Sequence, residues 1–283
     1  MKLQKDRIKA VVVDLDGTTL GTDAVLSERT RLTLRSCIAR GIRVVIATGR
    51  SVEAAEQYRK AIGVEGAMVY YNGAMTLDMP SRSILDSHFI GQDVISCCVD
   101  VAHEKDAHFH LFLCNSTGAF SETLMAERSS GATTVYRNRT GLDFLYGNLY
   151  RALPDDGSVC CIKGIFIEEE RKLRGIQQIV MERLNGKVNT MLSAEFILEI
   201  LAADVTKASG LRAALKFYGL SPSEIIAFGD EENDIAMLSF AGHSVAPANA
   251  RQSVRDIAKS VIGPNTDDSV AVFLENLFSL PPV

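Results

Sequence analysis

Short apolar runs alternate with amphipathic stretches over the first 70 residues. Residues 11–13, 42–47 and 67–70 are rich in β-branched or other apolar side chains and predict buried strands. Residues 27–40 and 51–62 lie between these runs and predict helices. Strand, helix, strand, helix and strand with short connections predict a parallel sheet with right-handed crossovers.

The pattern changes between about residues 78 and 191. Isolated strands and helices are predicted there, at residues 93–103, 110–114, 160–167 and 168–184. Residues 116–156 are polar and glycine-rich, and their pattern assigns no element. We interpret the whole region as an inserted α+β domain.

The alternation of strands and helices then returns. Strands are predicted at residues 196–201, 224–228, 243–246 and 260–262. Two tandem domains would leave the three N-terminal strands without partners. The predicted fold class is therefore α/β, with a Rossmann-like parallel-sheet core (residues 1–77 and 192–283) that an α+β cap domain (residues 78–191) interrupts.

Capping residues mark two of the predicted helices. Ser27 is a favourable N-cap, and Gly41 would end the helix that follows it. Thr206 is a second favourable N-cap, so Lys207 is expected in the first turn of a helix that ends near Gly219.

Composition narrows the class of protein. The 283 residues are 47% hydrophobic, which suffices for a sizeable core, and the formal net charge of −5 argues against a nucleic-acid partner. No run approaches the roughly 20 apolar residues of a membrane span. The six cysteines lack metal-knuckle spacing and are interpreted as reduced, mostly buried thiols of a cytoplasmic protein.

Two acidic residues, Asp14 and Asp16, end the first predicted strand, and Gly17 follows them. Because alternate residues of a strand share a face, we expect both carboxylates to start out on the same side. Crowded carboxylates are unfavourable unless a cation or a shared proton relieves their repulsion. The alternative is a strand followed by an ordinary Asx-type turn.

Polar residues also follow other predicted core strands. They are Thr48-Gly49-Arg50, Asn72-Gly73 and Gly229-Asp230. The carboxyl ends of parallel strands meet at one edge of an open sheet, which is where ligands bind. We therefore expect Asp14, Asp16 and Asp230 to form an oxygen-rich cluster, which favours Mg²⁺ over zinc because no His or Cys takes part.

These residue types are suited to phosphoryl transfer. A carboxylate such as Asp14 can attack phosphorus and form an acyl phosphate, provided that a metal ion reduces the repulsion between the two anions. Lys207 would add a positive charge, and Thr48 with the N–H groups of the next helix would bind phosphoryl oxygens. Asp16 would protonate the leaving oxygen and then deprotonate the attacking water.

Four motifs occur in order along the chain. They are Asp14-x-Asp16-Gly17-Thr18, Thr48-Gly49-Arg50, Lys207 and Gly229-Asp230-x-x-Asn233-Asp234, with Asn72-Gly73-Ala74 and Asn249-Ala250 as further signatures. This set resembles the motifs of the haloacid dehalogenase-like (HAD) phosphatases, and more closely those of their Cof-type sugar-phosphatase branch. The resemblance covers about residues 9–72 and 196–278 and implies the HAD fold with a large inserted cap.

The resemblance also implies a role for each matched residue. Asp14 would be the nucleophile and Asp16 the acid/base. Mg²⁺ would be held by Asp14, the main-chain carbonyl of Asp16 and Asp230, with Asp234 supporting the metal shell. The phosphate and substrate would be bound by Thr48, Gly49, Arg50, Asn72, Lys207 and Asn233. Two departures from the family pattern are Ala208, where Gly is usual, and residues 246–248, where Met-Gly usually precedes Asn-Ala.

The expected activity is the Mg²⁺-dependent hydrolysis of a small phosphorylated metabolite through phospho-Asp14. One alternative is a phosphomutase, which would return the phosphoryl group to a substrate hydroxyl. Another is a sensor that binds phosphorylated ligands without turnover, although such a protein would be expected to lack a nucleophile or a metal ligand. Neither nucleic acid nor membrane is expected as a partner, and the protein is expected to be a monomer or a homodimer.

Four further residues have two readings: Arg50, Glu199 and the pair His108 and His110. Arg50 either contacts substrate or pairs with a core carboxylate. Glu199 either reaches a substrate hydroxyl or has a structural role. His108 and His110 share one face of a predicted strand, and a packed or exposed strand is favoured over a metal site because no third ligand lies nearby.

Overall fold

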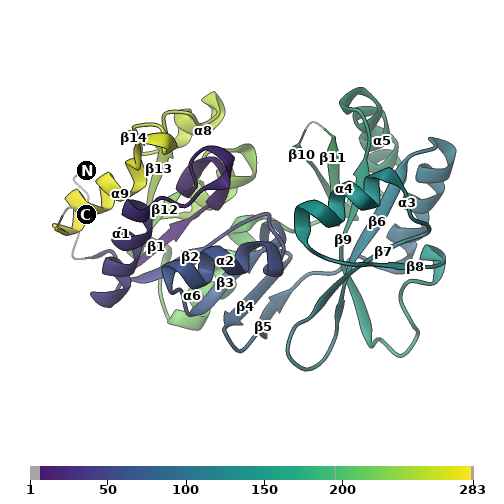
Figure 1. Ribbon diagram of the computed structural model, residues 1–283, viewed down its shortest axis with the longest axis horizontal. Coiled ribbons are helices and arrows are strands. Elements are labelled where there is room, and N and C mark those ends of the chain that lie inside the picture. The colour runs from purple at the N-terminus through teal and green to yellow at the C-terminus, as the bar shows by residue number, and fades with distance from the viewer. Residues whose placement is uncertain (1–6, 195, 282–283) are drawn as a thin grey trace. The chain divides into compact units, whose positions relative to one another are not determined.

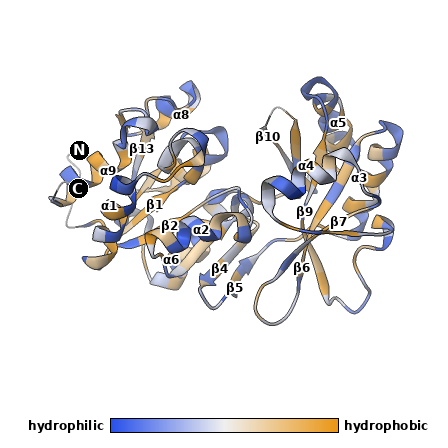
Figure 2. Ribbon diagram, in the orientation of Figure 1, coloured by the Kyte–Doolittle hydropathy of each residue, from blue (hydrophilic) through white to orange (hydrophobic). Residues whose placement is uncertain are grey.

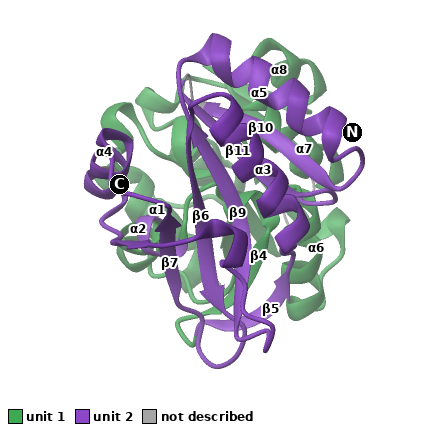
Figure 3. Ribbon diagram, turned by 90° about the vertical axis from the view of Figure 1, so that its right-hand side faces the viewer, with its two compact units in different colours: residues 1–51, 55–81, 206–283 green, residues 52–54, 82–205 purple. Residues whose placement is uncertain are grey.

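The computed structural model of the protein describes residues 7–194 and 196–281 (Figure 1). The chain forms two compact units, which Figure 3 shows in green and purple. The first, called the core unit here, consists of residues Met1–Ser51, Ala55–Ser81 and Thr206–Val283. The second, called the inserted unit, consists of residues Val52–Ala54 and Arg82–Val205.

The core unit is built on a five-stranded sheet in the order β14-β13-β12-β1-β2. Its strands are β1 (Ala10–Val13), β2 (Arg43–Ile46), β12 (Ile225–Phe228), β13 (His243–Pro247) and β14 (Ser260–Ile262), and all neighbours are parallel. Every residue of β1 and β12 is buried. Burial on both faces explains why these strands are continuous apolar runs rather than alternating ones. The predicted parallel-sheet core is confirmed.

Helices lie between and after these strands along the chain. They are α1 (Glu28–Ala39), α2 (Val52–Ile62), α6 (Lys207–Tyr218), α7 (Ile235–Phe240), α8 (Gln252–Ile257) and α9 (Ser269–Phe278). An antiparallel pair, β3 (Gly66–Tyr70) and β4 (Met75–Met79), continues the core through a bridge between Val69 and Ala47. Strand β5 (Ser83–Ser87) follows along the chain.

The predicted helix caps are confirmed. The Ser27 side chain accepts a hydrogen bond from the backbone N–H of Thr30 at 3.0 Å. Thr206 and Ser209 form a reciprocal capping box at the start of α6, and Gly219 ends that helix in the left-handed conformation. These caps place Lys207 at the first position of α6, which decides where its side chain points.

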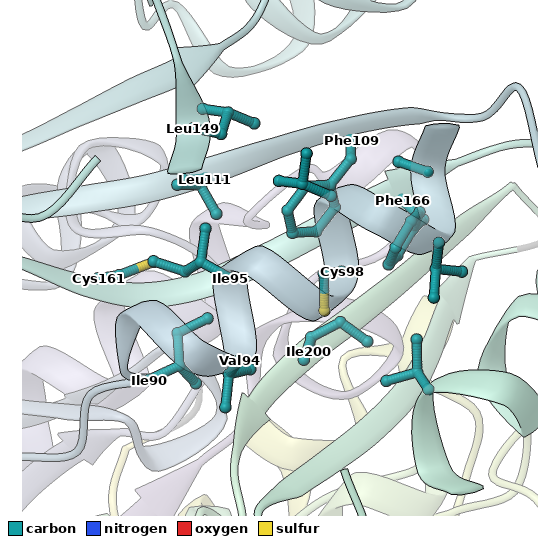
Figure 4. Close-up of a cluster of buried hydrophobic side chains, with 14 of the residues drawn as sticks. Ile90, Val94, Ile95, Cys98, Phe109, Leu111, Leu149, Cys161, Phe166 and Ile200 are labelled. Carbon is teal, nitrogen blue, oxygen red and sulfur yellow. The ribbon is translucent and has the colours of Figure 1, made fainter. Parts of the chain in front are cut away.

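The inserted unit is built on a six-stranded sheet in the order β10-β11-β9-β6-β7-β8. Its strands are β6 (His108–Asn115), β7 (Glu122–Ala126), β8 (Phe144–Tyr146), β9 (Val159–Ile167), β10 (Val188–Ala194) and β11 (Ile197–Ala202). Helices α3 (Gln92–Glu104) and α5 (Glu170–Arg183) bury their apolar side chains against this sheet. Figure 4 shows part of this second core, in which Ile95 and Cys98 lie near Leu111 and Phe166.

Two expectations about this region are corrected. The sequence pattern places the strand at residues 196–201 in the core, but β11 pairs antiparallel with β9 and β10 in the inserted sheet. The chain therefore returns to the core unit at Thr206, and the predicted boundary at residues 191/192 lies within β10. An apolar run shows that a strand is buried but does not show which sheet it joins. Residues 116–156, which had no assignment, contain β7, β8 and α4 (Gly131–Thr140).

The distribution of hydrophobic residues and the state of the cysteines agree with the sequence pattern. Figure 2 shows hydrophobic residues along the strands of both sheets and hydrophilic residues on outer helices such as α8. All six cysteines are free thiols, and four of them are buried. Within residues 7–194 and 196–281, no helix is long and apolar enough to cross a membrane.

Candidate active site

Four side chains with opposite charges come together beyond the carboxyl ends of β1 and β12. Asp14 directly follows β1, and Asp230 and Asp234 follow β12. Lys207 reaches them from the start of α6. Their exposed fractions are 5% for Asp14, 5% for Asp230, 0% for Asp234 and 1% for Lys207. Charges this deeply buried are unfavourable unless they pair or bind an ion.

Lys207 bridges two of the three carboxylates. Its Nζ atom lies 2.6 Å from Oδ1 of Asp14 and 2.7 Å from Oδ1 of Asp234. The second oxygen of Asp234 accepts hydrogen bonds from the backbone N–H groups of Asp230, at 2.9 Å, and Glu231, at 3.1 Å. Asp234 therefore holds both the lysine and the loop that carries Asp230.

The turn after β1 packs directly against Asp230. The Thr18 hydroxyl donates a hydrogen bond to Oδ1 of Asp230 at 2.5 Å. Gly17 has a φ of +75°, and a Cβ atom there would lie 2.2 Å from the Asp230 carboxylate. Only glycine fits this position, both because of its backbone conformation and because of this close approach.

Burial dominates the electrostatics of the cluster. It raises the pKa of Asp14 well above its ordinary value; Lys207 lowers that pKa, and Asp234 and Asp230 raise it further. Burial likewise raises the pKa of Asp230 to about 7, against the hydrogen bond from Thr18. Burial alone would lower the pKa of Lys207, but the charges of Asp14 and Asp234 outweigh it and raise that pKa above 10.5. One ammonium thus faces more negative charge than it can neutralise.

This donor set fits a hard divalent cation. Asp14, Asp230 and Asp234 each offer a carboxylate oxygen, and these three oxygens lie within 4.8 Å of one another. All three ligands are oxygens, which Mg²⁺ prefers, and a cation would offset the burial and the mutual repulsion that raise the pKa of Asp14 and Asp230. The residues present therefore fit the expected Mg²⁺.

Asp16 does not point into this cluster, which corrects the expectation that it shares a face with Asp14. Strand β1 ends at Val13, so the alternation of faces does not continue through the turn Leu15–Thr19. The Asp16 side chain is 56% exposed and forms a two-armed ion pair with Arg50, at 2.6 and 2.7 Å. Arg50 thus pairs with a carboxylate, and its guanidinium also lies 5.0 Å from the ring centroid of Tyr58. Contact of Arg50 with substrate stays a prediction.

The other predicted phosphate-binding residues follow β2, β3 and β12. Thr48 is fully buried, and its hydroxyl oxygen accepts a hydrogen bond from the backbone N–H of Arg50 at 3.1 Å. The Asn233 amide donates to Oδ1 of Asn72 at 2.9 Å. A Cβ atom at Gly49 would lie 2.9 Å from the same Asn72 oxygen. Thr48, Gly49, Asn72 and Asn233 therefore belong to connected segments of the core unit.

Glu199 is placed differently from the prediction. It lies within β11 rather than at its end, and its carboxylate is 2.9 Å from Nζ of Lys163 in the inserted unit. The structural reading of Glu199 accounts for this ion pair. Lys163 could not be predicted from the sequence, because a single lysine in an apolar strand carries no spacing signal.

His108 and His110 pack against each other, as the favoured reading expected. Nε2 of His108 lies 3.0 Å from Nδ1 of His110. His110 is fully buried and packs edge-on against Tyr136 and Phe144. Within the described part of the chain, neither histidine belongs to a group of three potential metal ligands.

The fold and the site define an α/β enzyme with an inserted domain. A model of the haloacid dehalogenase-like hydrolases matches residues 11–274, and the chain belongs to this family. The family resemblance drawn from the sequence motifs is thereby confirmed.

Relatives match over nearly the full chain. This chain is 29% identical over 274 residues to the 5-amino-6-(5-phospho-D-ribitylamino)uracil phosphatase YitU of Bacillus subtilis. The match covers 95% of this chain and 97% of that protein. A haloacid dehalogenase-like hydrolase from Bacteroides thetaiotaomicron superposes with a TM-score of 0.81 at 26% identity, covering 96% and 100% of the two chains. The structure of TM0651 from Thermotoga maritima gives 0.81 at 25% identity, with 95% and 97% coverage.

Proposed function

We propose that this protein is a Mg²⁺-dependent phosphatase that hydrolyses a small phosphomonoester, such as a sugar phosphate, through a phosphorylated Asp14. The observation that carries the proposal is the buried Lys207, which contacts Asp14 and Asp234 beside Asp230 in a hydrolase fold. Membership of the family supports hydrolysis. The relative YitU is a phosphatase of a ribitylaminouracil phosphate, which supports a small phosphorylated metabolite as the substrate class.

Asp14 and Asp16 carry out different steps of the proposed reaction. A carboxylate oxygen of Asp14 attacks phosphorus, the bond to the leaving oxygen breaks, and Asp16 supplies the proton to that oxygen. Asp16, now ionised, accepts a proton from the water that attacks phospho-Asp14, which releases inorganic phosphate and restores Asp14. Bound Mg²⁺, held by Asp14 and Asp230 with the Asp16 main-chain carbonyl, would neutralise charge on the phosphoryl oxygens.

The surrounding groups support these two steps. The Lys207 ammonium lies 2.6 Å from Asp14 and favours the ionised nucleophile. Arg50 donates two hydrogen bonds to the Asp16 carboxylate and so orients that side chain. Thr48 and Asn233 would bind the phosphoryl oxygens, with the amide of Asn233 oriented by Asn72.

Turnover of p-nitrophenyl phosphate tests the proposal. We expect hydrolysis with Mg²⁺, loss of activity with EDTA, and recovery when Mg²⁺ is added in excess of the chelator. Activity that is indifferent to EDTA would contradict the proposal. With a sugar phosphate, release of inorganic phosphate indicates hydrolysis, whereas accumulation of an isomeric sugar phosphate would indicate the phosphomutase alternative.

A further inference from the structure

Two asparagines link the C-terminal part of the core unit to the turn that carries Asp16. The Asn249 amide donates its Nδ2–H to the carbonyl of Gly17 at 2.8 Å, and its Oδ1 accepts from the backbone N–H of Asn265 at 2.9 Å. The Asn265 side chain in turn donates to the carbonyl of Leu20 at 2.7 Å. Because each end of the Asn249 amide has a partner of fixed polarity, its orientation is determined.

The loop that carries Asn249 is itself held in place. Arg255 of α8 donates to the carbonyl of Ala248 at 3.0 Å and also to the carbonyl of Ala250. The backbone N–H of Arg251 donates to the carbonyl of Asp230 at 2.9 Å. Strand β13, which precedes this loop, neighbours β12 and not β1 in the sheet. The loop therefore passes the end of β12 to reach the turn after β1.

The turn after β1 needs such support. Leu15–Thr19 departs from regular helical geometry at Asp16 (φ −75°, ψ 126°) and at Gly17 (φ 75°). The Gly17 carbonyl lies one peptide unit beyond Asp16, so a hydrogen bond to it restricts the backbone that aims the Asp16 side chain. That side chain is more than half exposed. Arg50 holds its carboxylate directly, at 2.6 and 2.7 Å, whereas the hydrogen bond to Gly17 restricts the backbone from which it extends.

We infer that Asn249, oriented by Asn265, is a positioning residue that holds Asp16 where it can protonate the leaving group. The inference rests on the proposed function, because it concerns the acid of that reaction. Asn249 acts through the backbone of Gly17 and not by contact with the reacting atoms. Replacing Asn249 is therefore expected to slow the reaction most for substrates whose leaving group must be protonated.

Two leaving groups separate this role from a merely structural one. p-Nitrophenolate leaves without protonation, whereas the alkoxide of a sugar phosphate needs a proton. For Asn249→Ala, we expect kcat/KM to fall about tenfold for a sugar phosphate and by less than about twofold for p-nitrophenyl phosphate. Asn276→Ala is the matched control, because that asparagine is also exposed and donates to a backbone carbonyl, of Val272, at 2.9 Å. It should change neither value.

A double variant tests whether the effect passes through Asp16. Adding Asn249→Ala to Asp16→Ala should cause no further loss with either substrate, because the group being positioned is already missing. Equal losses with both substrates, no loss with either, or additive losses in the double variant would each overturn the inference. If Asn249→Ala does not fold, Asn265→Ala provides the same comparison. A failure of the proposed function would show separately, as wild-type turnover indifferent to EDTA.

Discussion

The two units each bury a lysine, and the charge around each lysine differs. In the inserted unit, Lys163 forms an ion pair with the carboxylate of Glu199 at 2.9 Å. In the core unit, Lys207 meets Asp14 and Asp234 with Asp230 beside them. Within the described residues, these three carboxylates are the one group placed to share a metal ion. Burial alone therefore does not identify the active site; negative charge in excess of the lysine does.

The largest expected effect is on the nucleophile. Asp14→Asn keeps the shape of the side chain but removes its ability to form an acyl phosphate. We expect hydrolysis of p-nitrophenyl phosphate to fall by at least about a thousandfold. Thermal unfolding should show that the variant still folds, because removing one of three buried carboxylates lowers their mutual repulsion. Near-normal turnover would remove the covalent step from the mechanism.

Lys163 and Glu199 of the inserted unit should behave as a structural ion pair. Lys163→Met leaves the buried Glu199 carboxylate without this ammonium, and we expect a loss of about 3–5 kcal/mol in the free energy of unfolding. The double variant Lys163→Met/Glu199→Leu should recover most of that loss, because no buried charge of the pair remains. Urea unfolding of the two variants measures the difference. A double variant no more stable than the single one would show that the pair is not simply structural.

The three carboxylates around Lys207 should instead make the core unit more stable when a cation binds. Binding of Mg²⁺ to the folded protein alone stabilises it by about 2.7 kcal/mol at one hundred times the dissociation constant. We expect a rise in the unfolding temperature on adding Mg²⁺, which Asp230→Asn should largely abolish. Lys163→Met/Glu199→Leu should keep the rise. If Mg²⁺ leaves the unfolding temperature of the wild-type protein unchanged, the excess negative charge does not form a metal site.

The same contrast explains how much of the site the sequence could predict. Residues at strand ends, such as Asp14 and Asp230, could be predicted because parallel strands bring their carboxyl ends to one edge whatever their separation along the chain. Lys207 could be predicted because its position depends on a local signal, the cap at Thr206. These predictions needed only the order of the elements and the fact that the sheet is parallel.

Other features depend on information that periodicity does not contain. The direction of Asp16 depends on where β1 stops, and a one-residue difference there changes the face on which a side chain lies. The sheet to which β11 belongs depends on pairing with β9, which an apolar run does not specify. The contact of Asn249 with Gly17 joins an exposed side chain to a distant carbonyl, and no local pattern predicts such a bond.

The smallest expected effect concerns acid sensitivity, which the histidine pair should confer on the inserted unit. Burial lowers the pKa of His108 to about 4, with Glu168 opposing the shift, and burial lowers the pKa of His110 well below its ordinary value. A histidine with a depressed pKa stabilises the fold fully above pH 6.5, its unfolded value. Between pH 6.5 and 4 the unfolded chain binds more protons, so stability falls as the pH falls.

For His108 alone, this difference amounts to about 2 kcal/mol between pH 8 and pH 5. We therefore expect the free energy of unfolding, measured in urea at the two pH values, to fall by about 2 kcal/mol less in His108→Asn than in the wild-type protein. If His108→Asn keeps the wild-type pH dependence, the acid sensitivity lies outside the histidine pair.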